Sequence, residues 1–227
     1  MGTSATSPPP TAGRSGRRQA SSVLWLTGFG RFPGVPDNPT AHIARALAGR
    51  RFGRFEVTSD VLPVHFDAAE QRLAEGYERW RPRLAVHLGV ASRRNLVSFE
   101  RRAHNQVVLG CPDASGFVAT DPRIDPAFAV GAARSTGVLL PPLVAALARA
   151  GFGARISNDA GAYLCNLSYW HGLQRAAAAS WAMDTLFVHV PPVGATDPRS
   201  GVIWQLDRLV AAVDSALLAL TADPSLT

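Results

Sequence analysis

Short apolar segments alternate with amphipathic segments of helical period along most of this chain, and the alternation restricts the folds open to it. Strands are expected at residues 23–27, 55–61, 84–88, 154–157 and 185–190. Helices are expected at residues 38–49, 67–80, 141–150, 161–178 and 200–221. Strands that alternate with helices form a mostly parallel sheet covered by helices on both faces. The sequence therefore predicts an α/β fold, a single three-layer α/β/α domain with a mixed, largely parallel sheet.

Several helices carry start signals. Asn38 is expected to cap the first helix, Asp67 with Glu70 resembles a capping box for the second, and Ser200 is expected to cap the last. Residues 89–125 show little periodicity, so the sequence is least informative there.

The length of 227 residues, 47% of them hydrophobic, favours one large domain over two. Residues 1–22 are rich in Ser, Thr, Pro, Gly and Arg and have almost nothing to bury, so we expect a disordered tail there. The domain itself is expected at residues 23–221, followed by a short C-terminal tail at 222–227.

Composition argues against several partners. Three of the six net positive charges come from Arg14, Arg17 and Arg18 in the tail, and the body has no patch of basic and aromatic residues, so we expect no nucleic-acid partner. The chain has no run of about 18 apolar residues and no apolar signal-peptide core. We therefore expect no membrane association and a cytoplasmic location.

The two cysteines, Cys111 and Cys165, are too few for a four-thiolate metal site, and the other potential ligands show no metal-binding spacing. We therefore expect no metal and no organic cofactor, and a reducing compartment fits the low cysteine content. Cys111, between Gly110 and Pro112, is expected to be an inert loop or packed cysteine.

Cys165 is the strongest candidate for a reactive group. It is expected near the start of a helix, just after the strand at 154–157. A helix N-terminus carries partial positive charge, which favours a thiolate and lowers the pKa of a cysteine placed there. The sequence therefore predicts a nucleophilic thiol at Cys165.

A cysteine nucleophile needs a group that takes its proton, and histidine suits that role near neutral pH. Among the six histidines, His189 is best placed because it ends a buried strand where a site would open. A core histidine bonded to backbone is an equally good explanation of that position. Glu100, a lone acid among cations, fits the group that orients the imidazole, although an exposed salt-bridged glutamate is the commoner case.

Motifs in four separated segments follow one another in a recognisable order. They are Thr27-Gly28-Phe29 with Phe32 and Asn38-Pro39; Leu88-Gly89 followed by Arg94, Glu100-Arg101 and Asn105; Ser157-Asn158 with Ala160-Gly161 and Cys165-Asn166; and His189-Val190-Pro191. Together they resemble the pyroglutamyl peptidase I (pyrrolidone carboxyl peptidase) family over about residues 23–218. Any one of these motifs alone would be weak.

The resemblance implies a cysteine peptidase that removes an N-terminal pyroglutamyl residue from peptides through a thioester acyl-enzyme, on a single α/β/α domain. In that case Cys165 matches the nucleophile, His189 the general acid/base and Glu100 the group that orients the histidine. Phe29 and Phe32 match the aromatic residues that line the pocket for the lactam ring.

The resemblance also places Asn38 and Val90 beside the substrate, and it implies assembly as a dimer or tetramer. Val90 stands where the family usually has glutamine, Arg93 replaces a glycine, and Gly110 aligns with an arginine expected near the reacting carbonyl. Two alternatives stay open: a divergent amidase or peptidase of the same fold and triad with shifted acyl specificity, and an inactive relative that only binds.

Overall fold

The computed structural model describes residue 2 and residues 21–32 and 34–223 of the chain. The tails predicted at residues 1–22 and 222–227 lie almost entirely outside the described residues. In the described part, no helix is both long and apolar enough to cross a membrane.

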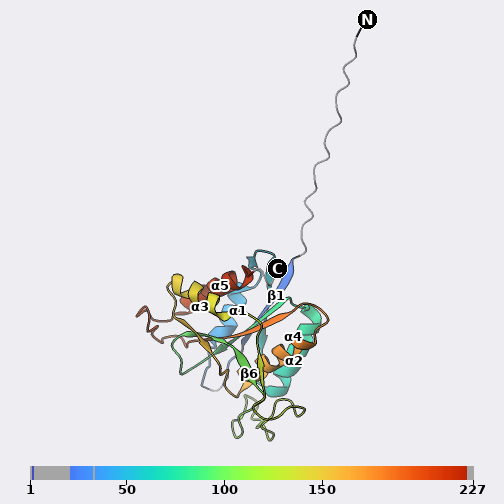
Figure 1. Ribbon diagram of the computed structural model, residues 1–227. Helices are drawn as coiled ribbons and strands as arrows, with labels where there is room; N and C mark the ends of the chain where they lie inside the picture. Colours follow the sequence, from blue (N-terminus) through green and yellow to red (C-terminus); the bar gives the residue numbers. More distant parts are fainter. Residues whose placement is uncertain (1, 3–20, 33, 224–227) are drawn as a thin grey trace.

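The chain alternates strands and helices for most of its length (Figure 1). In chain order the elements are β1 (Ser22–Phe29), α1 (Pro39–Leu47), β2 (Arg51–Phe52), β3 (Phe55–Leu62), α2 (Phe66–Trp80), β4 (Leu84–Val90), β5 (Val97–Glu100), β6 (Arg102–His104), β7 (Ala133–Ser135), α3 (Leu140–Arg149), β8 (Ala154–Ser157), α4 (Leu164–Ala178), β9 (Asp184–Val190) and α5 (Leu206–Thr221).

Within the described residues, the main sheet has seven strands in the order β2-β3-β1-β4-β9-β5-β8. The strands β3, β1, β4 and β9 run parallel to one another, whereas β2 pairs antiparallel with β3 and β5 pairs antiparallel with β9. The outermost strand, β8, runs parallel to β5. The predicted α/β fold with a mixed, largely parallel sheet is confirmed.

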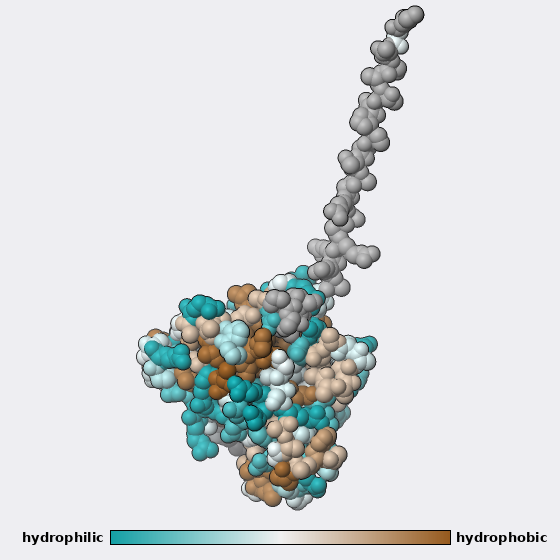
Figure 2. Space-filling view, in the orientation of Figure 1, coloured by the Kyte–Doolittle hydropathy of each residue, from teal (hydrophilic) through white to brown (hydrophobic). Residues whose placement is uncertain are grey.

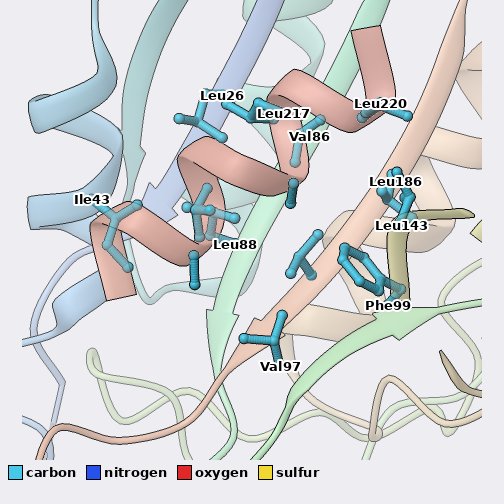
Figure 3. Packing of buried hydrophobic residues seen from close by; sticks show 14 of the residues in the cluster. Leu26, Ile43, Val86, Leu88, Val97, Phe99, Leu143, Leu186, Leu217 and Leu220 are labelled. Atoms are coloured by element: carbon cyan, nitrogen blue, oxygen red, sulfur yellow. The ribbon is translucent and has the colours of Figure 1, made fainter. Parts of the chain in front are cut away.

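Side chains alternate across the central strands and so build two separate cores. Leu26 of β1 packs with α1, α3 and α5 on one face, where Figure 3 shows it near Leu217 of α5. Its neighbour Trp25 packs with α2 and α4 on the other face. Figure 1 shows these two groups of helices on opposite sides of the sheet.

The predicted capping box of α2 is wrong. The helix begins at Phe66 after His65, and no side chain of this segment caps it locally. Instead the Oδ2 atom of buried Asp113, from a distant loop, accepts the Phe66 N–H at 2.9 Å. A long-range carboxylate thus replaces the local pair that Asp67 and Glu70 suggested.

The last helix also begins later than expected. It starts at Leu206, and Ser200 lies in the loop that follows β9, where its Oγ accepts from Arg208 Nη2 at 3.0 Å. Asp197, fully buried in the same loop, accepts the Gly153 N–H at 2.8 Å. These contacts hold the loop in place, so the hydroxyl that looked like a helix cap serves a tertiary contact.

The loops between β6 and β7, residues 105–132, form a lobe at the lower end of the view in Figure 1. Figure 2 shows apolar as well as polar residues on its surface, and its exposed apolar side chains include Leu109, Phe117, Phe128 and Val130. The lobe reaches the start of α4, because the Val108 N–H donates to the Ala162 carbonyl at 2.6 Å.

His87 of β4 is fully buried between two hydroxyl groups. Thr27 Oγ1 lies 2.7 Å from its Nδ1 atom and Tyr77 Oη lies 2.7 Å from its Nε2 atom. Burial lowers the pKa of His87 to about 3 because the charged imidazolium loses its hydration there.

This burial predicts a pH dependence of stability. Below its ordinary pKa of 6.5 the histidine binds a proton in the unfolded chain but not in the folded one, so acid favours unfolding. At about pH 4 the loss is expected to be about 3 kcal/mol. Urea unfolding at several pH values measures it, and a His87→Gln variant should show a correspondingly weaker loss between about pH 6 and 4. An equal loss in both proteins would contradict the assignment to His87.

Candidate active site

A cavity of about 470 Å³ opens where β1, β4 and β9 end, on the side of the sheet that carries α4. Its walls include six residues singled out from the sequence: Phe29, Phe32, Asn38, Val90, Cys165 and His189. The loop that leads from β8 to α4, residues 158–163, covers the same opening. β8 runs opposite to the central strands, so this loop has to turn back to reach the cavity.

Cys165 is the second residue of α4. A left-handed glycine, Gly161 with φ of 83°, bends the chain before the helix, and its N–H donates to Asp159 Oδ1 at 2.8 Å. The first hydrogen bond of the helix region runs from Leu167 N–H to Tyr163 O, which leaves the preceding N–H groups without helical acceptors. The turn thus presents the thiol beside backbone donors.

Gly89 explains how the sulfur comes close to the sheet. A Cβ atom at this position would lie 2.7 Å from Cys165 Sγ, nearer than side-chain atoms approach one another. Gly89 is paired in register with His189 on the neighbouring strand, and paired residues of parallel strands face the same side. The thiol and the imidazole therefore lie on the same side of the sheet, and both line the cavity.

His189 is held by a carboxylate. Its Nδ1 atom lies 2.8 Å from Glu100 Oε1, and its ring packs on Phe187 with centroids 4.9 Å apart. A carboxylate accepts, so Nδ1 is the donor of this bond and Nε2 is left as the acceptor on the cavity side. Because the partner of His189 is a side-chain carboxylate, the alternative of a core histidine bonded to backbone does not hold.

Glu100 is fully buried, which excludes the exposed salt-bridged glutamate that its sequence context favoured. It ends β5, a four-residue strand between β9 and β8 that lies inside the segment with little periodicity. Besides His189, Arg94 bonds it: Arg94 Nη1 donates to Glu100 Oε1 at 2.6 Å. The hydroxyl of buried Tyr169 donates to the Glu100 carbonyl oxygen at 2.7 Å.

Arg94 and Tyr169 are the hydrogen-bond partners of Glu100 that sequence reasoning did not assign. Arg94 was part of a family motif but was given no role. The signal that could have identified it is its position six residues before Glu100, a lone acid among cations. Tyr169 lies one helical turn after Cys165, on the α4 face that packs on the sheet. A helical wheel of α4 would have placed it toward the core but not beside Glu100.

The expected lowering of the Cys165 pKa is wrong for this structure. Burial raises the pKa of the Cys165 thiol to about 12, with a further increase from the charge of Glu100. Arg94 and a backbone hydrogen bond act in the opposite direction but are weaker. Loss of hydration of the thiolate thus outweighs the helix N-terminus. Near neutral pH the thiol keeps its proton, so it needs an adjacent base in order to react.

The far wall of the cavity is mainly apolar, with Phe29, Phe32 and Val90 among its residues. Asn38 also lines it, but its amide is engaged by backbone: Oδ1 accepts from Thr40 N–H at 3.1 Å, and Nδ2 donates to the Gly30 carbonyl at 3.0 Å. The predicted cap of α1 by Asn38 is confirmed. Asn38 therefore shapes the wall and starts α1.

The three departures from the family pattern, at Val90, Arg93 and Gly110, fall at different places. Val90 lies on the cavity wall, whereas Gly110 is not among the lining residues and occupies a left-handed turn with φ of 74°. Arg93 and Arg94 both line the cavity and supply positive charge on the β4 side. Cys111 is exposed and lies outside the cavity lining.

No metal-binding group emerges from the described residues, in which no cluster of three or more His, Cys, Asp or Glu side chains is placed to hold an ion. The chemistry available at the cavity is that of a thiol and an imidazole that line the same cavity, with the imidazole bonded to a buried carboxylate. This combination is suited to nucleophilic acyl transfer.

Comparison with known proteins points to the same chemistry. A family model described as "Pyroglutamyl peptidase" matches residues 22–222. The pyrrolidone-carboxylate peptidase of Pyrococcus furiosus is 33% identical over 204 residues, which cover 85% of this chain and 96% of that protein. The enzyme of the same name from Pseudomonas fluorescens is 31% identical over 205 residues, covering 89% and 94%.

Solved structures agree in fold. A mutant pyrrolidone carboxyl peptidase from Pyrococcus furiosus superimposes with a TM-score of 0.80 at 29% identity, covering 90% of this chain and 100% of that one. The pyrrolidone carboxyl peptidase from Thermococcus litoralis gives a TM-score of 0.79 at 26% identity, covering 88% and 93%.

Proposed function

The chain belongs to the pyroglutamyl peptidase family of cysteine peptidases, and on that basis we propose that it removes the N-terminal pyroglutamyl residue from peptides through a thioester on Cys165. The observation that carries the proposal is the bond between His189 Nδ1 and the buried Glu100 carboxylate, next to the cavity that Cys165 enters. The proposed roles are nucleophile for Cys165, general acid/base for His189 and orienting group for Glu100.

In the first half of the reaction, His189 Nε2 takes the thiol proton as the sulfur of Cys165 attacks the pyroglutamyl carbonyl carbon. This transfer is needed because burial keeps the thiol protonated near neutral pH. The backbone N–H groups at the start of α4 face the cavity and stabilise the oxyanion, an effect worth about 3 to 4 kcal/mol per donor. The C–N bond then breaks, and the imidazolium gives its proton to the departing amine.

In the second half, water attacks the thioester carbonyl while neutral His189 takes a proton from it. The C–S bond breaks, free pyroglutamate leaves and the thiol of Cys165 regains its proton. Glu100 keeps the imidazole in one tautomer and orientation through both halves, because a carboxylate can only accept a hydrogen bond and Nδ1 must therefore carry the hydrogen.

The cavity wall supports selection of a neutral ring. Phe29, Phe32 and Val90 offer apolar surface, which suits an uncharged lactam and disfavours a charged amino group that would lose its hydration. Proline has a ring of the same size but carries a charged nitrogen at neutral pH, so it is the matched substrate for a test of this wall.

The test is release of a fluorescent amine from its pyroglutamyl and prolyl amides. The protein should cleave the pyroglutamyl amide and leave the prolyl amide intact. Cleavage of other acyl amides instead would favour the divergent amidase with shifted specificity. Release from no substrate by a folded protein would overturn the proposal in favour of an inactive binding relative.

The remaining features stay predictions. They are the cytoplasmic location, the lack of a nucleic-acid partner, and assembly as a dimer or tetramer. Sedimentation of the purified protein measures the last of these.

A further inference from the structure

Arg94 bridges two parts of the site that are distant in sequence. It follows β4 in a turn closed by its own N–H, which donates to the Ala91 carbonyl at 2.9 Å. Its side chain is 19% exposed and forks between two acceptors. Nη1 donates to Glu100 Oε1 at 2.6 Å, and Nη2 donates to the Asp159 carbonyl at 2.6 Å.

The first contact bears on the orientation of His189. Glu100 Oε1 accepts from both His189 Nδ1 and Arg94 Nη1, whereas the buried Oε2 has no hydrogen-bond partner among the described residues. The carboxyl group is therefore held through one oxygen only, and Arg94 is one of the two side chains that hold that oxygen. A carboxylate buried this deeply also needs a cation close by, and Arg94 is permanently charged.

The second contact bears on Cys165. Asp159 belongs to the loop that covers the cavity and leads into α4, so the guanidinium joins the carboxylate of β5 to the segment that presents the thiol. The charges act on the sulfur in opposite directions: Glu100 raises the pKa of Cys165 and Arg94 lowers it. Without Arg94, only the backbone hydrogen bond at Cys165 would oppose the effect of the carboxylate on the sulfur.

We propose that Arg94 is a positioning residue of the peptidase reaction, which holds Glu100 in the orientation that fixes His189 and anchors the loop before Cys165. The inference rests on the function proposed above. It adds a fourth side chain to the three of the triad, one that acts through Glu100 and Asp159 and transfers no proton itself.

Arg94→Ala provides the first measurement, with the pyroglutamyl amide as substrate. We expect kcat to fall about 100-fold with little change in KM, because the base would no longer be held in line with the thiol. Arg83→Ala is the matched control. The Arg83 side chain is also 19% exposed and its Nη1 also donates to a carboxylate, that of Asp184, at 2.6 Å, but it lies at the opposite end of the sheet. Its kcat should stay close to that of the wild type.

Two readouts separate positioning from a loss of folding. Arg94→Ala removes a permanent positive charge beside the Glu100–His189 pair, and a less positive site holds protons more tightly, so the rising limb of kcat/KM should move to higher pH in Arg94→Ala and stay in place in Arg94→Lys. Guanidinium ion at non-denaturing concentration should restore part of the activity of Arg94→Ala. It should restore none in Arg94→Met, whose side chain fills the space.

Circular dichroism shows whether each variant is folded. If Arg94→Ala is not folded, the kcat of Arg94→Lys is compared with that of the wild type instead. Unchanged kcat in a folded Arg94→Ala, or a loss of kcat with an unshifted pH profile and no rescue, would overturn the inference. An inactive wild type would instead overturn the proposed function, so the two failures are distinguishable.

Discussion

Replacement of Cys165 by alanine is expected to reduce release of amine from a pyroglutamyl amide by about 10⁶-fold, to the level left by binding and backbone donors alone. The reason is that no other nucleophilic thiol lines the described cavity, because Cys111 is exposed elsewhere. Initial rates over a wide range of enzyme concentration measure the loss.

Cys111→Ala is the matched control and should retain nearly full activity. Mass spectrometry of acid-quenched wild type should show a pyroglutamyl group on the peptide that contains Cys165. Cys165→Ala should show no pyroglutamyl group on that peptide. Substantial activity in Cys165→Ala would refute covalent catalysis by this residue.

Glu100→Gln is expected to lower kcat by about 10⁴-fold while leaving the shape of the site almost unchanged. A glutamine amide can donate to His189 Nδ1, which would favour the tautomer whose Nε2 carries hydrogen and cannot take the thiol proton. Steady-state kinetics with the pyroglutamyl amide provide the measurement.

The matched control is Glu70→Gln. Glu70 of α2 also faces a histidine, His171 of α4, at 3.6 Å, but Glu70 is largely exposed and the pair lies outside the cavity. Its kcat should be nearly unchanged, since an exposed pair of this kind contributes little. Equal rates for Glu100→Gln and the wild type would remove Glu100 from the proposed triad.

Local sequence patterns were sufficient to predict most of the strands and helices that form the three layers. Central strands such as β4 and β9 read as apolar runs, and Asn38 with Pro39 marked the start of α1, because these signals depend on neighbours within a few residues. The cap of α2 and the start of α5 were predicted wrongly because Asp113 and Ser200 form contacts outside their own segments.

Part of the candidate site could also be predicted from the sequence, but not from local patterns. Its residues Cys165, His189 and Glu100 were selected by chemistry and by resemblance to a family, and the structure brings them to one place. The strand that carries Glu100 was missed because four residues are too few to show a period. Its identity as a strand depends on pairing with β9, far along the chain.

The sequence by itself determined the order of the central strands and the helices and the side chains able to do chemistry, since both follow from residue type and spacing. Only the tertiary structure decided the surroundings of those side chains. The two Glu100 bonds, from His189 and Arg94, join different segments, and burial of Cys165 raises its pKa where the helix start alone would lower it. Hydration and charge act through space, so a thiol's reactivity depends on what packs around it.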